Sequence, residues 1–206
     1  MLLLFSSLCV FSDAQGWKIG IETGLRISKP PHYHSHIGCD IGARTEFSLL
    51  SVDQHNIFLA PSIVLSWRGW KDYVSDMLDE SLSSEWNCDV YYLDIPLQVG
   101  YKYIASASYN LYAEAGGYIS YGLSGKSKLD FNGEDWGDKN IFKSGLYKNF
   151  DYGTKIGIGI NLKQWQLGIE WSRSWQKPTT GNWNGINPID SSVIIRLCYF
   201  LRNWKF

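Results

Sequence analysis

The sequence predicts an all-β protein, a single eight-stranded antiparallel up-and-down β-barrel that spans a membrane. Apolar and polar residues alternate one by one along eight stretches, each at or beyond the roughly 9–11 residues that cross a bilayer as a strand. The connections between the stretches are alternately short and long. Aromatic residues make up 16% of the 206 residues and gather near the ends of the apolar runs. Girdles of aromatic residues at both interfaces are typical of membrane barrels.

The stretch 91–103 shows the alternation clearly, with Leu93, Ile95 and Leu97 on one face and Asp94 and Gln98 on the other. The predicted strands span 17–27, 37–49, 57–67, 91–103, 109–123, 150–162, 165–175 and 191–201. Pro61 interrupts the third strand and predicts a bulge. The long connections, 28–36, 68–90, 124–149 and 176–190, follow every second strand. This asymmetry predicts long extracellular loops, short periplasmic turns and both chain ends on the periplasmic side.

The polar faces of the strands decide between a membrane barrel and a soluble one, in which the apolar face would line the interior. These faces combine many glycines with ionisable residues of both signs. A narrow eight-stranded lumen needs small residues for room and opposite charges that pair with one another. The apolar face is therefore predicted to meet lipid, and the polar face to fill the lumen. The predicted lumen charge network consists of Glu22, Arg26, Asp40, Arg44, Glu46, Asp94, Lys102, Glu114, Lys155, Glu170 and Arg196.

The first 14 residues resemble a secretory signal peptide. Residues 2–11 are apolar, and Ser12 and Ala14 supply the small residues of a cleavage site after Ala14, although no Lys or Arg precedes Leu2. The alternative is a short buried apolar strand. The predicted organisation is thus a signal peptide over 1–14 and a barrel domain over 15–206. Three cysteines would remain, an odd number that implies no complete disulfide framework: Cys39, Cys88 and Cys198.

Several strand motifs resemble those of a known family. The segment 92–102 (YLDIPLQVGYK) is similar to the fourth strand of the PorT-like outer-membrane barrels of Bacteroidetes, and 113–123 (AEAGGYISYGL) to the strand that follows. Residues 151–153 and 157–159 resemble the sixth strand. The resemblance implies an eight-stranded outer-membrane barrel of OmpA/OmpX-like architecture. The founding member is linked to protein secretion, a role that we do not carry over.

The family tends to end at an aromatic residue that closes the last strand. Phe200 occupies such a place, but the chain continues through 202–206. Either the strand runs on to Phe206 or a short tail follows.

Candidate reactive residues are few. His32, His34 and His36 alternate in the first long connection and could bind Zn²⁺ or Cu²⁺ if the segment is extended. The alternative is a polar loop that Pro30 and Pro31 hold extended. The acidic connection 68–90 could hold Ca²⁺, but it lacks the spacing of an EF-hand. No spacing typical of a nucleophile and its base stands out, so we assign no metal site, cofactor or catalytic residue.

We therefore expect a non-enzymatic barrel with a side-chain-filled lumen in the outer membrane of a Gram-negative cell. It would act through extracellular loops in binding, adhesion or envelope structure. A component of a protein secretion or envelope assembly machine is the alternative, and a rim-active membrane enzyme comes third. Expected partners are outer-membrane lipid, an extracellular protein or glycan, and envelope proteins. The formal net charge of −1 does not favour nucleic acid. Loop aromatics support contacts at the rim: Tyr33, Trp70, Tyr73, Trp86, Trp136 and Trp183.

Overall fold

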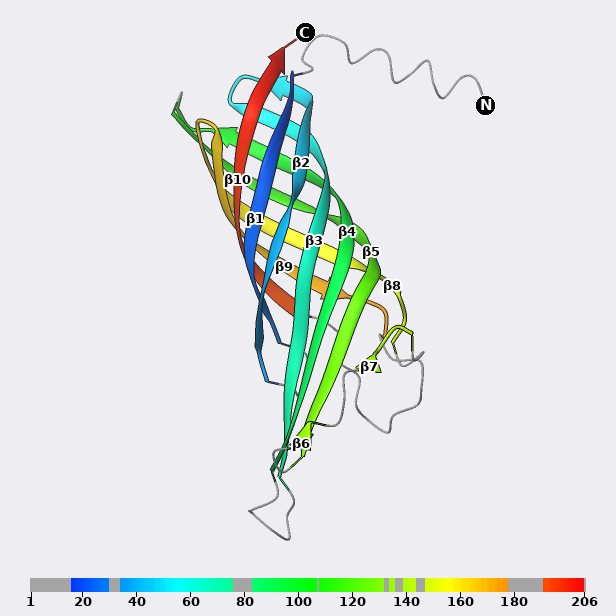
Figure 1. Ribbon diagram of the computed structural model, residues 1–206. Helices are drawn as coiled ribbons and strands as arrows, with labels where there is room; N and C mark the ends of the chain where they lie inside the picture. Colours follow the sequence, from blue (N-terminus) through cyan, green and yellow to red (C-terminus); the bar gives the residue numbers. More distant parts are fainter. Residues whose placement is uncertain are drawn as a thin grey trace, which may run out of the picture.

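Eight long antiparallel strands form a tilted ring in the computed structural model of the protein (Figure 1). The structure describes residues 16–29, 34–75, 83–106, 108–131, 134–135, 139–143, 147–177 and 191–205. The long strands are β1 (Gly16–Ser28), β2 (His36–Val52), β3 (His55–Ser75), β4 (Ser83–Ile104), β5 (Tyr109–Phe131), β8 (Phe150–Leu162), β9 (Trp165–Ser174) and β10 (Ser191–Lys205). Two short strands, β6 (Glu134–Asp135) and β7 (Lys139–Asn140), pair with β5.

Each long strand pairs with the next long strand along the chain, and β10 returns to pair with β1. This last ladder runs from Gly16 opposite Lys205 to Ser28 opposite Ser192. The predicted up-and-down barrel is therefore confirmed. The predicted signal peptide, residues 1–14, lies outside the described residues. No helix in the described part of the chain is long and apolar enough to cross a membrane.

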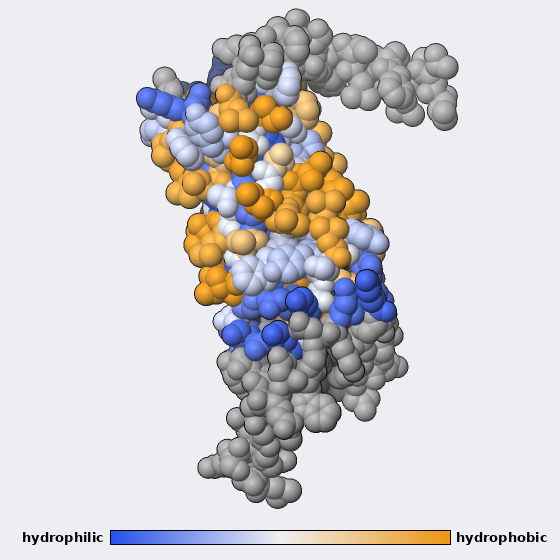
Figure 2. Space-filling model, in the orientation of Figure 1, coloured by the Kyte–Doolittle hydropathy of each residue, from blue (hydrophilic) through white to orange (hydrophobic). Residues whose placement is uncertain are grey.

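The apolar side chains cover the outside of the ring and the charged ones fill its inside. Ile158 and Ile37 are 64% and 63% exposed, whereas Arg26 and Arg44 inside the ring are 0% exposed. Figure 2 shows the apolar residues as an orange band across the visible face of the barrel, with polar residues below it. Such a surface is stable in lipid, where the strands satisfy one another's backbone groups around the closed ring.

Aromatic side chains mark both edges of this band. At the periplasmic end, where the short turns and the strand termini lie, the rings of Trp165 and Tyr199 have centroids 4.6 Å apart. At the extracellular end, Trp67 stacks on Tyr91 with centroids 6.1 Å apart. The segment of β4 from Tyr91 to Tyr103, if tilted by roughly 40° from the barrel axis, rises about 30 Å along that axis. This height equals the thickness of the hydrocarbon core.

Three strands extend well beyond the predicted ones. Much of 68–90 and the start of 124–149 were expected to be loop, but β3, β4 and β5 continue there as a sheet. Period-two alternation ends at the membrane edge because neither face of a strand beyond it meets lipid, so the pattern could not reveal these extensions. At the other end, β10 continues to Lys205 rather than ending in a tail.

The prediction of a bulge at Pro61 is wrong, because the structure has no register shift there. The pairing of β2 with β3 keeps one register from Arg44–Ser62 to Phe47–Leu59, and the register shifts instead between Ser48 and Leu50. Proline removes one ladder donor without requiring an extra residue. The carbonyl of Pro61 accepts a hydrogen bond from Thr45 Oγ1 at 3.1 Å, which joins the two strands at this gap in the ladder.

The lipid-facing wall can be tested by a charge at mid-height. Ile158 points outward from the middle of β8, so Ile158→Arg should lower the free energy of unfolding by about 2–4 kcal/mol. Leu162→Arg, beside the periplasmic turn, is the matched control and should cost only about 0–1 kcal/mol. Urea unfolding in lipid vesicles, followed by tryptophan fluorescence, measures both. Equal costs would contradict the assignment of Ile158 to the centre of the membrane.

Candidate functional site

The lumen contains layers of ion pairs, and Arg68 of β3 organises the extracellular layer. Its Nη2 donates to Asp94 Oδ1 at 2.6 Å, and its Nη1 donates to Asp151 Oδ2 at 3.1 Å. Asp94 also accepts hydrogen bonds from Ser66 at 3.0 Å and Ser120 at 2.7 Å. Residues from β3, β4, β5 and β8 therefore meet at one cation, which fixes the relative positions of these four strands.

Two further contacts complete this layer. The guanidinium of Arg68 lies 4.7 Å from the ring centroid of Tyr92 and 5.4 Å from that of Tyr118, within the range of cation–π attraction. Beside it, Arg26 of β1 donates in bidentate fashion to Asp40 of β2, with bonds of 2.9 and 2.7 Å. Bidentate pairing gives both energy and a defined orientation.

The middle layer surrounds Arg196 of β10. Arg196 binds Glu114, which also binds Arg44. On its other side, Arg196 Nη1 donates to Glu170 at 3.1 Å, and Lys155 Nζ lies 3.0 Å from the same carboxylate. Each of the two carboxylates thus lies between two of the three cations of this layer.

The periplasmic layer is smaller. Lys102 of β4 pairs with Glu46 of β2, and Gln166 of β9 donates to the same carboxylate at 3.0 Å. The ammonium of Lys102 also lies 4.3 Å from the ring centroid of Phe58. Both side chains of this ion pair are buried, so the pair is expensive to break.

Glu22 differs from the other lumen acids. It is buried, and its Oε2 has no hydrogen-bond partner among the described residues. A cavity beside it, with room for about one water molecule, is also lined by Gln98, Lys155, Glu170 and Arg196. A single buried water with these polar neighbours would satisfy the carboxylate.

All eleven residues predicted for the lumen lie inside the ring and are buried. Ten of them form ion pairs among the described residues, and Glu22 is the exception. The prediction missed Arg68 and Asp151. Arg68 lies one residue beyond the predicted end of its strand, in phase with the inward Ser66, so extending the alternation by one step would have found it. Asp151 lies in the predicted strand 150–162, on the same face as the predicted lumen residue Lys155.

An apolar cluster closes the extracellular mouth above Arg68. Residues 141–142, from the connection between β7 and β8, fold back over the barrel, and Tyr147 Oη accepts a hydrogen bond from Trp70 Nε1 at 2.9 Å. Gly122 makes room for this, because a Cβ there would come within 2.3 Å of the Phe142 ring. Trp70, expected as an exposed loop aromatic, is buried here. The cluster consists of Trp70, Cys88, Val90, Tyr92 and Ile141, with Phe142 and Tyr147 packed against it.

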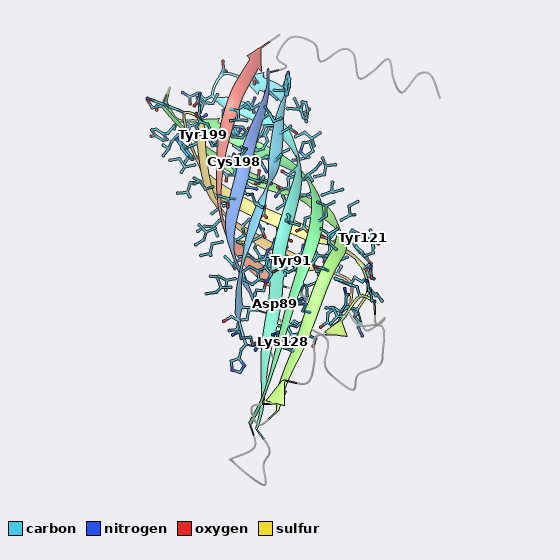
Figure 3. The ribbon with its side chains drawn as sticks, viewed as in Figure 1. Asp89, Tyr91, Tyr121, Lys128, Cys198 and Tyr199 are labelled. Carbon is cyan, nitrogen blue, oxygen red and sulfur yellow. The ribbon has the colours of Figure 1, made fainter. Side chains whose placement is uncertain are left out.

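The outer face of β3 and β4 carries a polar cluster just beyond the aromatic girdle, and Figure 3 labels its Asp89 next to Tyr91 of the girdle. The ring of His36 lies over Gly69, where any side chain would clash, and packs edge-on against Trp67 at 5.3 Å. Asp89 Oδ1 accepts a hydrogen bond from Trp67 Nε1 at 3.0 Å and lies 3.0 Å from His36 Nε2. The start of β2 is thereby fastened across β3 to β4.

The three histidines considered as metal ligands do not act together in the described structure. His34 is exposed and its backbone bridges to Lys71, while His36 contacts Asp89. His32 lies outside the described residues. Among the residues that are described, no three His, Cys, Asp or Glu side chains are placed to hold a metal ion.

Two groups at the rim bear on catalysis. Burial raises the pKa of the Cys88 thiol, beyond the girdle, to about 12, so it stays protonated and is a poor nucleophile. His36 with Asp89 is the pairing that general-base catalysis uses, but its Nδ1 has no hydrogen-bond partner among the described residues. The described rim therefore contains a histidine–carboxylate pair without an adjacent nucleophile.

The ion pair of Arg26 with Asp40 gives a test of the lumen. Arg26→Met leaves Asp40 buried without its cation, and we expect a loss of about 3–5 kcal/mol in the free energy of unfolding. The double variant Arg26→Met/Asp40→Leu removes both charges and should recover most of this loss. Urea titrations in vesicles compare the two. A double variant as unstable as the single one would mean that the pair does not carry the effect.

Comparisons with known proteins agree with this architecture. The family described as outer membrane protein beta-barrel domain matches residues 12–175. Among solved structures, Neisserial surface protein A (NspA) is 11% identical over 92% of this chain and 97% of its own, with a TM-score of 0.51. OprG from Pseudomonas aeruginosa is 12% identical over 94% and 98%, with a TM-score of 0.46. Ail, the attachment invasion locus protein of Yersinia pestis, is 8% identical over 93% and 99%, with a TM-score of 0.40.

No curated protein matches the chain. The likeness to NspA shows the fold, and the family match covers most of the sequence. The chain belongs to the outer membrane protein beta-barrel domain family, and it is an eight-stranded barrel of the outer membrane.

Proposed function

We propose that the protein is a non-enzymatic binding module that acts through the part of its sheet that projects from the membrane. This extracellular sheet consists of 68–75 of β3, 83–90 of β4 and 124–131 of β5. The observation that carries the proposal is the asymmetry of the rim. These three strands continue far beyond the girdle, whereas β1, β8, β9 and β10 end close to it (Figure 1).

The extracellular sheet is paired along its whole length. Pairs between β3 and β4 continue from Arg68–Val90 to Ser75–Ser83, and β5 pairs with β4 as far as Phe131 opposite Ser84. At about 3.3 Å for each residue, the sheet reaches about 25 Å beyond the girdle. A hydrogen-bonded sheet of this length presents a partner with a surface already formed, which lowers the entropy lost on binding.

One edge of this sheet supports recognition of an extended segment. On the side of β2, β3 is paired as far as Ser66 and bridged at Lys71 by His34, with the His36 ring over Gly69 between them. The edge beside which the structure describes no paired strand is therefore 72–75. Strand edges of this kind can accept an additional strand from another protein. An extracellular protein with an exposed extended segment is therefore the partner that fits best, and adhesion is the corresponding role.

The rest of the barrel supports a role as an anchor rather than a pore. Ion pairs cross the lumen at three levels, and the Trp70 cluster covers its mouth. Interiors of eight-stranded barrels are filled by side chains. Stability and binding would therefore be separate properties of the two ends of the molecule.

A component of a secretion or envelope assembly machine is the second candidate. The similarity of 92–102 and 113–123 to the PorT-like barrels of Bacteroidetes favours it. Partners would then meet the wall or the periplasmic end, and the extracellular sheet would be dispensable. A rim-active enzyme, for which the pair of His36 and Asp89 is the only described support, comes third.

Deletion of the outer part of the sheet tests the proposal. Lys71 and Asn87 are paired, so an Asn-Gly turn can replace 72–86 and rejoin β3 to β4. Cells that display this variant should bind immobilised extracellular-matrix proteins about 30-fold more weakly than wild type, as expected when an interface loses an anchor worth about 2 kcal/mol. The control replaces 178–190 by a Gly-Ser segment of equal length and should keep its binding.

Both variants should keep the heat-dependent gel mobility of a folded barrel. Binding that survives the deletion would contradict the proposal. If envelope proteins cross-link equally to the wild type and to the deletion variant, while neither binds matrix proteins, the machine role would replace adhesion.

A further inference from the structure

Two cationic side chains lie on the outer wall opposite the extracellular sheet. Arg173 of β9 is paired with Ser191 of β10, and the backbone N–H of Lys29, just after β1, donates to the Ser191 carbonyl at 2.9 Å. Both cations are exposed, and both follow buried inward serines, Ser172 and Ser28. Arg173, Ser191 and Lys29 therefore form one outward-facing row across three adjacent strands.

The spacing of this row suits a single anionic group. Neighbouring strands are about 4.8 Å apart, which puts the backbones of Arg173 and Lys29 about 10 Å from each other, with Ser191 between them. Long side chains from both sides can converge on one phosphate above the serine. Arginine binds phosphate oxygens through two parallel N–H bonds, lysine contributes a point charge, and the hydroxyl can donate a further hydrogen bond.

The surface next to this row is apolar and continuous with the lipid-facing wall. Two residues closer to the membrane centre on each strand, Trp171, Val193 and Ile27 point outward and are 38–42% exposed. Beside the row, the ring of Trp175 packs edge-on against Tyr152 of β8. Aromatic side chains of this kind lie at the level of lipid headgroups. The two cations are thus at headgroup height, immediately above a wall that contacts acyl chains.

The charged side chains that the structure describes on the outside of this wall are all positive. No outward-facing side chain described on β1, β8, β9 or β10 is acidic. The described acids of these strands, Glu22, Asp151 and Glu170, all point into the lumen. An anion at the row therefore meets attraction without a competing carboxylate among the described residues of the wall.

We propose that Arg173, Lys29 and Ser191 bind the phosphate-bearing headgroup of an outer-leaflet lipid, with its acyl chains lying along Trp171, Val193 and Ile27. The apolar wall favours a lipid over a free phosphate, because only a lipid fills both parts of the site. Basic residues near a membrane surface are established recognition elements for anionic lipids. This site is independent of the extracellular sheet and lies on the opposite side of the rim.

Native mass spectrometry of the full chain in detergent micelles provides the test, with phosphatidic acid as probe and phosphatidylcholine of the same acyl chains for comparison. Wild type should bind phosphatidic acid more tightly. Arg173→Gln and Lys29→Gln should each weaken this binding about fivefold, and the double variant about 25-fold. Arg173→Lys should retain most of the binding. Lys143→Gln removes an exposed cation from the same end of the protein, away from the row, and should have no effect.

Three results would overturn the proposal. The first is equal affinity for the two lipids. The second is an equal loss in Lys143→Gln, which would indicate general attraction by positive charge. The third is displacement of phosphatidic acid by inorganic phosphate at the same concentration, which would indicate a free-anion site. Both substituted side chains are exposed, so the variants should fold, and heat-dependent gel mobility verifies this for each one before binding is compared.

Discussion

The ladder that joins β10 to β1 is the constraint on which the rest of the structure depends. A membrane interior offers no water to an unpaired strand edge, so the sheet has to close. Closing eight strands leaves a lumen too narrow for a water-filled channel. Inward charges then pair with opposite charges on other strands, as Arg68 does with Asp94 and Asp151, and Glu22 is the described exception. The apolar wall, the glycines and the crossed ion pairs all follow from ring closure.

Much of the barrel wall was predictable from the sequence, because lipid requires apolar side chains and the lumen requires polar or small ones at alternate residues. β8 begins and ends where the alternation does, and Asp94 and Lys102 lie inside as their phase indicated. Prediction failed where that constraint ends. The strands beyond Arg68 lie above the bilayer, where no period-two signal exists. Contacts such as that of His36 with Asp89 join residues 53 positions apart and depend on how β2 leaves the ring, which no local pattern encodes.

The two sides of the extracellular rim have different chemistry. On one side, three strands rise as a paired sheet, fastened to β2 by His36, Asp89 and Trp67. On the other, the strands stop near the girdle and present Arg173 and Lys29 above an apolar wall. Because the two sides of the rim differ, the orientation of the barrel about its axis determines which side meets a given neighbour in the membrane. Under our proposals, one side would face a protein partner while the other keeps a lipid in place.

The length of β10 has a consequence for biogenesis. Its last described residue, Lys205, pairs with Gly16 at the very start of β1, so the two strands that complete the ring come from opposite ends of the chain. The sheet must therefore persist with two exposed edges until β10 has been delivered, and the cost of bringing such distant segments together falls on the step that closes the ring. An unclosed sheet is prone to pair with other chains. Pairing of β10 with β1 therefore removes the two exposed edges of the unclosed ring and, with them, the risk of pairing with other chains there.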